Sequence, residues 1–336
     1  MVSFRDFIPS SMHGPLRRAI HRGRAVQLTY NDHLLYHKHA APAGQSINVR
    51  NDRALIMYYT HSIEKGLTRE DFRPSFGNRP LTALAQLLNR WIDDGRDPRD
   101  TFFDAACATL RTYFSRHDDL GVNVGDKLAL FAPEVQKLIL GSSTAGGFRT
   151  VRFDRQRHRS FGELTADRVS LREFEPGPVD LGLISDAASI ASRSPSACNR
   201  QSSRLHVVTD PGLIDKILRI QAGLGGYDRP PVLLLVTSDT SYYVEATERN
   251  QPFVDGALFA MTLMYALEDA GVGTCPLTAM LWPRSEKKVR ALLDLPKSEA
   301  LVTFVAVGRQ PALTRVPYSR RESVESIMTL HESGDR

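Results

Sequence analysis

The stretch Val232–Thr237, VLLLVT, is an apolar run without a charged side chain. An unbroken run of this length is typical of a buried strand, whereas a half-exposed strand alternates apolar and polar residues. Apolar runs at Leu205–Thr209 and Leu301–Val307 predict two further strands. The segments with helical periodicity are Leu181–Ser192, Pro211–Gln221, Phe253–Ala270, Arg284–Leu293 and Arg321–Leu330. From about Phe161 onward, the sequence therefore predicts a domain in which helices and strands alternate.

The first half of the chain has a different pattern, in which helical periodicity dominates. The predicted helices are a short one at Leu16–Arg22, then Arg53–Gly66, Leu81–Asp94, Asp100–Arg116 and Glu134–Leu140. The segment Gly141–Gly147, GSSTAGG, has the composition of a flexible connector, and a short extended piece is expected at Phe148–Phe153. We therefore expect two domains: a mostly helical region over residues 1–150, serving as a substrate lid or a dimer extension, and a second domain over residues 151–336.

Composition limits the classes of function. The chain has 336 residues, 42% hydrophobic and 24% charged, which is ordinary for one large or two smaller globular domains. Its formal net charge of +5 favours anionic ligands without singling out nucleic acid. No block of Lys and Arg is interleaved with aromatic residues, so we expect no nucleic-acid partner. An alternative in which the arginine-rich N-terminal region contacts an anionic surface or a nucleic acid stays open.

Three distant cysteines, Cys107, Cys198 and Cys275, form no CxxC pair, which argues against a disulfide framework and against structural zinc. We interpret Cys198 and Cys275 as small packing residues. The histidines of NDHLLYHKH lack a carboxylate partner, so no metal is expected. No apolar run approaches the length of a membrane span, and residues 1–25 lack the apolar core of a secretory signal. The expected location is the cytoplasm, without a membrane partner.

The segment Thr165–Phe174, TADRVSLREF, contains a candidate phosphate site. A helix that starts at Thr165 and runs through the segment would place Arg168 and Arg172 at i and i+4, on one face. Ser170 adds a hydroxyl between them. Two guanidinium groups and a hydroxyl suit a phosphomonoester, because arginine can donate two parallel hydrogen bonds to phosphate oxygens. The alternative is a solvated ion-pair face, since acidic residues surround both arginines.

Four further segments extend this pattern. They are Ser194–Gln201 (SPSACNRQ), Arg249–Gly256 (RNQPFVDG), the glycine-rich Gly271–Met280 (GVGTCPLTAM) and Tyr318–Arg321 (YSRR). The first is a loop of small and amide residues that could face a flat heterocycle, and the third is expected to be a helix exit whose backbone N–H groups approach a ligand closely. Each segment by itself is weak evidence, whereas the ordered set is more specific.

In this order and spacing, the segments resemble the nitroreductase family of FMN-dependent oxidoreductases. The resemblance covers about Phe161–Leu330. Within the family, the chain is similar to a subgroup that has an extra N-terminal helical region and is loosely associated with polysaccharide-biosynthesis genes. It implies an α+β fold with a mainly antiparallel sheet wrapped by helices. It also implies an intertwined homodimer with FMN at the interface, with helix Phe253–Ala270 in the dimer spine. That helix is apolar nearly all round and must be buried on several sides.

The resemblance also implies a role for each matching residue. Arg168, Ser170 and Arg172 would hold the FMN phosphate and the pyrimidine edge of the ring, and Arg320 would complete the phosphate site. A nearby Arg172 would stabilise the negative charge of a reduced flavin.

Further residues would contact the flavin ring. The loop residues that would face it from the partner subunit are Pro195, Ser196, Ala197 and Asn199. Backbone groups near Thr278 and Ala279 would donate to flavin N5.

The chain departs from the family pattern in two places. Ser202–Ser203 stands where Pro and an aromatic residue are common, and Thr278–Ala279 stands where many members have Glu-Gly.

The implied activity is transfer of hydride from NAD(P)H through flavin N5 to an electron-poor acceptor by a ping-pong mechanism. The acceptor would be a small molecule: a nitroaromatic, a quinone or an activated alkene. No side chain is expected to act as a nucleophile, because the cofactor carries the chemistry. Two alternatives stay open: a flavin-dependent dehydrogenase or oxidase acting on a biosynthetic intermediate, and a non-catalytic binding or scaffold protein.

His61 and Lys65, which share a helix face with Glu64, are the candidate substrate contacts in the N-terminal region; the other interpretation is a solvated face.

Overall fold

The computed structural model describes residues 10–39, 48–153 and 159–331. The chain divides into two compact units. The sheet unit comprises the described residues of Met1–His39 and Phe153–Ala312, and the helical unit those of Ala40–Arg152 and Leu313–Arg336. The chain passes from the helical unit to the sheet unit between Arg152 and Phe153, and the C-terminal segment from Leu313 groups with the helical unit. The expected division into domains 1–150 and 151–336 stays a prediction.

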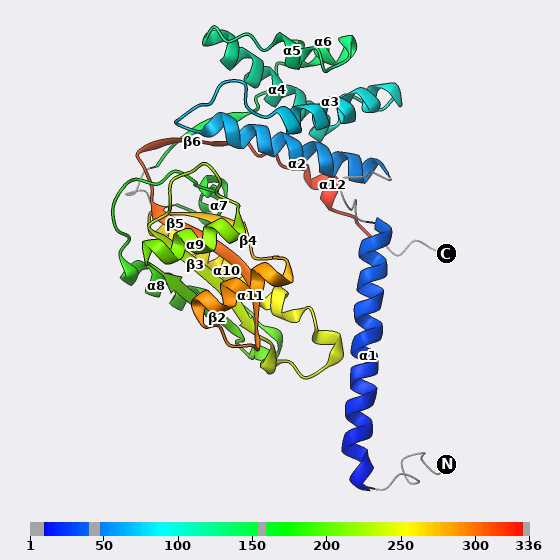
Figure 1. Ribbon diagram of the computed structural model, residues 1–336, viewed down its shortest axis with the longest axis vertical. Coiled ribbons are helices and arrows are strands. Elements are labelled where there is room, and N and C mark those ends of the chain that lie inside the picture. Colours follow the sequence, from blue (N-terminus) through cyan, green and yellow to red (C-terminus); the bar gives the residue numbers. More distant parts are fainter. Residues whose placement is uncertain (1–9, 40–47, 154–158, 332–336) are drawn as a thin grey trace. The chain divides into compact units, whose positions relative to one another are not determined.

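The sheet unit is built on a four-stranded antiparallel sheet in the order β2-β3-β5-β4 (Figure 1). Its strands are β2 (Ser203–Val208), β3 (Val232–Asp239), β4 (Val272–Thr278) and β5 (Glu299–Arg309). Its helices are α1 (Ser10–His39), α7 (Phe161–Asp167), α8 (Leu181–Ala191), α9 (Pro211–Gln221), α10 (Gln251–Asp269) and α11 (Pro283–Leu293). Short 3-10 turns are η3 (Ala197–Asn199), η4 (Thr240–Tyr242) and η5 (Ala246–Glu248).

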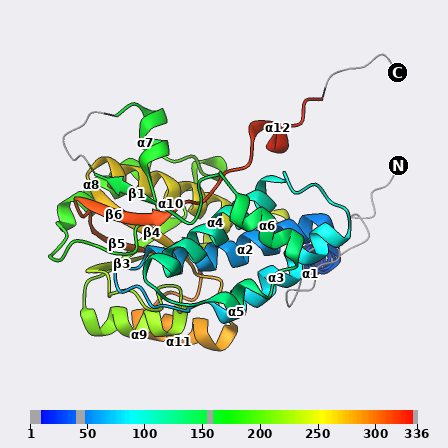
Figure 2. The same ribbon diagram turned by 90° about the horizontal axis from the view of Figure 1, so that it is seen from above.

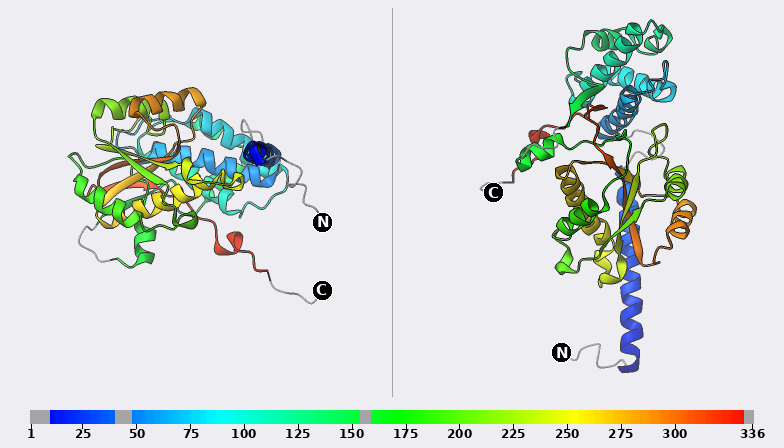
Figure 3. Two further views of the ribbon diagram at one scale, coloured as in Figure 1. Left: turned by 90° about the horizontal axis from the view of Figure 1, so that it is seen from below. Right: turned by 90° about the vertical axis from the view of Figure 1, so that its left-hand side faces the viewer.

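Both faces of the sheet are covered, which explains the unbroken apolar run in β3. Val232, Leu234 and Val236 pack in one core with residues of α8 and α10. Leu233 and Leu235 pack in the other core with residues of α9 and α11. Helices α9 and α11 lie side by side over that second face (Figures 2 and 3). Because successive strand residues point to opposite faces and both faces are covered, all five positions from Val232 to Val236 are apolar, and the prediction of a buried strand is confirmed.

The helical unit contains its own core and a small two-stranded sheet. Its elements are α2 (Val49–Thr68), α3 (Asn78–Asp93), α4 (Thr101–Asp119), α5 (Gly125–Leu128), α6 (Pro133–Gly141), β1 (Phe148–Arg152), β6 (Leu313–Pro317) and α12 (Val324–Ile327). Strands β1 and β6 pair antiparallel. Asp100 begins α4 by accepting hydrogen bonds from two backbone N–H groups of its first turn. The predicted α+β fold with an additional N-terminal helical region is confirmed.

Two predicted helices have different lengths in the structure. The closing helix expected at Arg321–Leu330 is wrong, because α12 spans only Val324–Ile327. Ile327 and Leu330 are exposed, so no packed apolar face stabilises a longer helix. At the other end, α1 runs over Ser10–His39 rather than Leu16–Arg22. None of the described helices is long and apolar enough to span a membrane.

Candidate functional site

The segment with the two arginines is not a helix, and the predicted helix start at Thr165 is wrong. Helix α7 begins earlier, where Ser160 and Glu163 form a reciprocal capping box, and it ends at Asp167. Beyond it the chain runs extended along β4, where the Leu171 N–H donates to the carbonyl oxygen of Thr274 at 2.9 Å. The capping box explains why the helix begins before Thr165, and the pairing of Leu171 with Thr274 accompanies its end at Asp167.

The extended conformation still places the three predicted ligands on one side. Val169 and Leu171 are buried at 8% and 1% exposure, while Arg168, Ser170 and Arg172 between and beside them are half-buried. Since successive residues of an extended segment point to opposite sides, the three polar side chains share the side away from the core.

Glycines in β4 and β5 make room for this segment. A Cβ at Gly273 would lie less than 3.0 Å from the Leu171 side chain, and one at Gly308 equally close to the Phe174 ring. Gly273 lies inside strand β4, so most of Gly271–Met280, expected as a glycine-rich helix exit, is a strand; the approach of its N–H groups to a ligand stays a prediction. Its glycine instead allows Leu171, and with it the arginine segment, to pack closely on the sheet.

Arg168 has a buried hydrogen-bond donor without a partner. Its Nη1 is buried and has no hydrogen bond in the described structure. Glu268 near the end of α10 is 1% exposed, and its Oε1 lies 3.2 Å from Arg159 Nη1. Burial raises the pKa of Glu268, and the positive charges of Arg159 and Arg168 oppose that shift. A buried guanidinium N–H that lacks an acceptor is costly, so this position fits an anionic ligand.

The loop Ser194–Gln201 is held in an uncommon backbone conformation. Cys198, Asn199 and Gln201 have φ values of 51°, 55° and 53°, in the left-handed region. The Gln201 N–H donates to Ser196 Oγ at 3.0 Å. Of the residues expected to face a flavin, Pro195 and Asn199 are exposed, and Ser196 and Ala197 are half-buried. Cys198 is exposed, so its interpretation as a packing residue is wrong.

Asp255 of α10 fixes this loop, and sequence reasoning did not assign it a role. The carboxylate is 2% exposed and accepts from the Ala197 N–H at 3.2 Å and from the Tyr243 O–H at 2.9 Å. The Tyr243 hydroxyl also lies 2.6 Å from the hydroxyl of Ser202. Ser202, one of the two residues that depart from the family pattern, thus joins a buried hydrogen-bond network. Asp255 also lines a cavity of about 230 Å³ that includes Pro195 and Ser196.

The loop and the arginine segment lie at different ends of α10 within one chain. Asp255, which binds the loop, and Glu268, which neighbours Arg168, are both on this helix. Thirteen residues separate them in the sequence. At 1.5 Å per residue this corresponds to about 20 Å. A single chain therefore does not bring the two groups of predicted ligands together.

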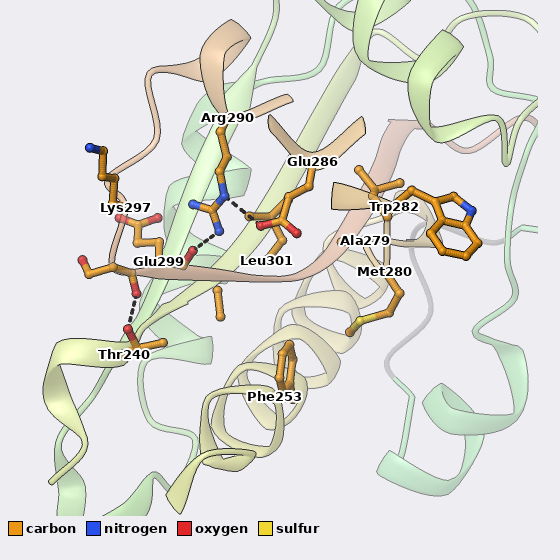
Figure 4. Close-up of a pocket in the computed structure, with 13 residues that line it drawn as sticks. Thr240, Phe253, Ala279, Met280, Trp282, Glu286, Arg290, Lys297, Glu299 and Leu301 are labelled. Carbon is orange, nitrogen blue, oxygen red and sulfur yellow. Dashed lines mark hydrogen bonds and ion pairs between the residues drawn. The ribbon is translucent and has the colours of Figure 1, made fainter. Parts of the chain in front are cut away.

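A second cavity, of about 630 Å³, lies where β4 ends and β5 begins (Figure 4). Ala279 lines it, together with apolar side chains of Phe253, Met280, Leu281, Trp282 and Leu301, and polar ones of Thr240, Glu286, Arg290, Lys297 and Glu299. Arg290 donates to Glu286 Oε1 at 2.8 Å. At the predicted flavin N5 contact, Thr278 Oγ1 accepts from the Met280 N–H at 3.1 Å. Sequence reasoning missed the polar residues of this cavity, because they come from η4, α11 and the start of β5 and form no motif.

The remaining candidates lie in the helical unit. His61 Nδ1 is 3.2 Å from Glu64 Oε2, and the buried Glu64 also accepts from the Ser319 N–H at 3.3 Å. Lys65 follows on the same helix, α2. Arg320 Nη1 lies 2.6 Å from Asp104 Oδ2, so its charge is already paired within this unit. The substrate role of His61 and Lys65 and the phosphate role of Arg320 stay predictions.

Comparison with known proteins identifies the sheet unit. The model of the Nitroreductase family matches residues 165–225 and 221–309, a range that contains the arginine segment, the 194–201 loop and β4. Residues 165–309 form a nitroreductase-family domain. The family is one of oxidoreductases, and the predicted resemblance to it is confirmed, whereas the association with polysaccharide-biosynthesis genes stays a prediction.

Individual relatives cover about half of the chain. An NADH dehydrogenase of Thermus thermophilus is 27% identical over 192 residues, which are 48% of this chain and 91% of the relative. A solved structure of an NADH dehydrogenase/NAD(P)H nitroreductase from Parabacteroides distasonis is 21% identical and covers 51% of this chain and 96% of its own, with a TM-score of 0.44. A nitroreductase family protein from Streptococcus pneumoniae is 19% identical and covers 51% and 100%, with a TM-score of 0.45.

Proposed function

We propose that the nitroreductase domain binds FMN and catalyses hydride transfer from NAD(P)H to an electron-poor small molecule by a ping-pong mechanism. The acceptor is a nitroaromatic, a quinone or an activated alkene. The observation that carries the proposal is the arginine segment: within a nitroreductase-family domain, Arg168, Ser170 and Arg172 share one side, and Arg168 Nη1 is buried without an acceptor.

These residues fit the phosphate end of FMN. Two guanidinium groups, which only donate, and a hydroxyl, which can donate, match a phosphate group that offers acceptor oxygens. The Glu268 carboxylate beside Arg168 is already neutralised by Arg159, so it leaves Arg168 available. When bound, FMN supplies the redox chemistry at N5. The backbone at Thr278–Ala279 then orients the ring, and the cavity of about 630 Å³ that Ala279 lines receives the acceptor.

The same geometry supports a homodimer as the functional unit. The loop with Pro195, Ser196, Ala197 and Asn199 lies about 20 Å along α10 from the arginine segment. A second copy related by a two-fold axis would bring its loop to the arginine segment of the first. Helix α10 carries exposed apolar side chains at Phe253, Val254 and Leu258, which such a copy would cover. Asp255 then positions the loop toward the partner's flavin.

The test is an absorbance spectrum of the purified protein before and after anaerobic addition of NADH or NADPH. The proposal expects a flavin spectrum, intrinsic or after addition of FMN, that is bleached by the nucleotide. Arg168→Gln should weaken FMN binding about tenfold to 150-fold, since a hydrogen bond to a charged group contributes about 1.5–3 kcal/mol. Arg229→Gln, which removes a surface ion pair with Asp215, is the matched control and should leave FMN binding unchanged. A protein that binds no FMN would overturn the proposal.

A further inference from the structure

We propose that the helical unit binds an elongated aliphatic monocarboxylate in a cavity beside α4. The proposal does not depend on the proposed flavin chemistry, because every residue that lines this cavity belongs to the helical unit. The cavity has a volume of about 560 Å³, which is within the usual range of about 300–1,000 Å³ for small-molecule sites. Its lining residues are Arg111, Phe114, Ser115, Asp118, Gly121, Val122, Asn123, Val124, Gly125, Leu128 and Leu140.

One face of α4 forms the first wall of the cavity. Its four lining residues, Arg111, Phe114, Ser115 and Asp118, are at i, i+3, i+4 and i+7, so their side chains lie in one row along the helix. Phe114 is 8% exposed and gives the row an apolar centre. Arg111 and Asp118 are exposed, and they lie about 10 Å apart along the axis at 1.5 Å per residue. The row therefore has a cation at one end and an anion at the other.

The turn after α4 begins the second wall. Gly121 has a φ of 66°, and the Val122 N–H that follows donates to the carbonyl oxygen of His117 at 2.9 Å. This hydrogen bond belongs to a Schellman motif, which reverses the chain and brings Val122 back beside the last turn of the helix. Leu128 on α5 and Leu140 on α6 add further aliphatic side chains, and Leu140 is 53% exposed. The apolar lining is thus mainly aliphatic and partly open to solvent.

The two charges of the row select the two ends of a ligand. Neither Arg111 nor Asp118 forms an ion pair with another of the residues that the structure describes. Lys127 on α5 donates to Asn78 at 2.5 Å, so its ammonium group is occupied elsewhere. Arg111 is therefore free to donate two parallel hydrogen bonds to a ligand carboxylate. At the other end, Asp118 and the negative end of the α4 dipole both repel an anion, so the far end of the ligand is uncharged or cationic.

The length and lining of the cavity define the middle of the ligand. An aliphatic chain that follows the row covers Phe114 and the leucine and valine side chains, and this contact removes apolar surface from water. The separation of about 10 Å between Arg111 and Asp118 is about the length of an extended ten-carbon chain. A monocarboxylate of this length reaches Arg111 with its head group and leaves Asp118 in contact with solvent.

The test is isothermal titration calorimetry of the full chain, in the presence of excess FMN, with decanoate and decanedioate as the probes. The probes have the same number of carbon atoms and differ at the far end of the chain. One decanoate should bind per chain, and decanedioate should bind about fivefold or more weakly, because Asp118 repels its second carboxylate. Asp118→Asn should remove this difference by strengthening the binding of decanedioate. Asp119→Asn, which changes the neighbouring exposed carboxylate outside the cavity, should leave both affinities unchanged.

Two further substitutions test where decanoate binds. Leu140→Glu should weaken decanoate binding about tenfold or more, since it replaces an apolar side chain of the wall by an anion. The matched control is Leu120→Glu, which changes a leucine that is 55% exposed and lies outside the cavity lining, and it should leave binding unchanged. Arg111→Gln should weaken decanoate binding about threefold to tenfold. All of the substituted side chains are exposed, so the variants should keep the far-UV circular dichroism spectrum of the wild type.

Three outcomes would overturn the proposal: no binding of decanoate by the wild-type chain, equal affinities for the two probes, or decanoate binding that Leu140→Glu leaves intact. The titration measures binding without turnover. A protein whose flavin is not bleached by NAD(P)H would contradict the proposed function and would still give a clear result for this cavity.

Discussion

Replacing Gly273 by alanine tests how the arginine segment is held on the sheet. The added Cβ would lie less than 3.0 Å from the Leu171 side chain, whereas carbon atoms in contact are ordinarily about 3.5–4.0 Å apart. Leu171 is 1% exposed, so it cannot turn into solvent without leaving the core. Either Leu171 or β4 must move by at least about 0.5 Å. We expect Gly273→Ala to lower the free energy of unfolding by about 1–3 kcal/mol, the usual cost of overpacking.

A double mutant distinguishes this clash from a general effect of alanine in β4. Leu171→Ala removes a fully buried side chain and should cost about 2–5 kcal/mol. If the steric account is right, the double mutant Gly273→Ala/Leu171→Ala should be no less stable than Leu171→Ala, because the group that clashes is gone. The two effects should therefore be non-additive by about 1–3 kcal/mol.

The assay is urea unfolding followed by far-UV circular dichroism, together with FMN titration by quenching of flavin fluorescence. Gly162→Ala is the matched control: it lies in α7 with nothing within 4 Å of the added Cβ. It should be neutral or stabilise by up to about 1 kcal/mol. Gly273→Ala should also weaken FMN binding, because Arg168 and Arg172 move with Leu171. Additivity within about 0.5 kcal/mol in the cycle would refute the packing argument whatever happens to FMN.

Three further predictions follow from the network around the 194–201 loop and from the cysteines. Iodoacetamide should label the exposed Cys198 in the native protein and leave Cys107 unmodified, since burial raises the pKa of Cys107 to about 12. Intact-mass spectrometry would count the labels on each chain. Two or more labels would contradict the structure. The Arg200 guanidinium and two backbone N–H groups lower the pKa of Glu248 to about 2, from an ordinary value of 4.5. This pair therefore stabilises the fold above about pH 4.5 and stops doing so as the pH falls toward 2, so the loss of Tm caused by Glu248→Gln should shrink over that interval. Asp255→Asn should cost about 1–3 kcal/mol in urea unfolding, because the amide group cannot serve all the donors that the carboxylate accepts; an unchanged midpoint would exclude its role in holding the loop.

Local sequence patterns were sufficient to predict most of the fold. The apolar run in β3 predicted a strand with both faces covered by protein, and the helical periodicity of Pro211–Gln221 gave α9 with its correct ends. Patterns failed where packing decides the conformation. The segment after Asp167 has a composition that permits a helix, but Leu171 gains more by filling the space over Gly273 beside β4.

The polar cavity could not be predicted for a different reason. Its members Glu286, Arg290, Lys297 and Glu299 form no motif: the first two lie on α11, and the antiparallel pairing of β4 and β5 brings the start of β5 to the same cavity. The register of that pairing is set by cores on both faces of the sheet. This register could therefore not be predicted from the sequence before the fold was known.

The arginine segment shows why a motif can be right about ligands and wrong about secondary structure. In a helix, Arg168 and Arg172 are four residues and about 400° apart, so they share a face, while Ser170 lies about 200° away on the opposite one. In an extended segment all three lie on the same side, since the side-chain period is two residues. A phosphate gripped by both arginines and the serine is therefore compatible with the extended conformation and incompatible with the helix. The strand-like pairing of Leu171 with Thr274 is thus a condition for the proposed phosphate site.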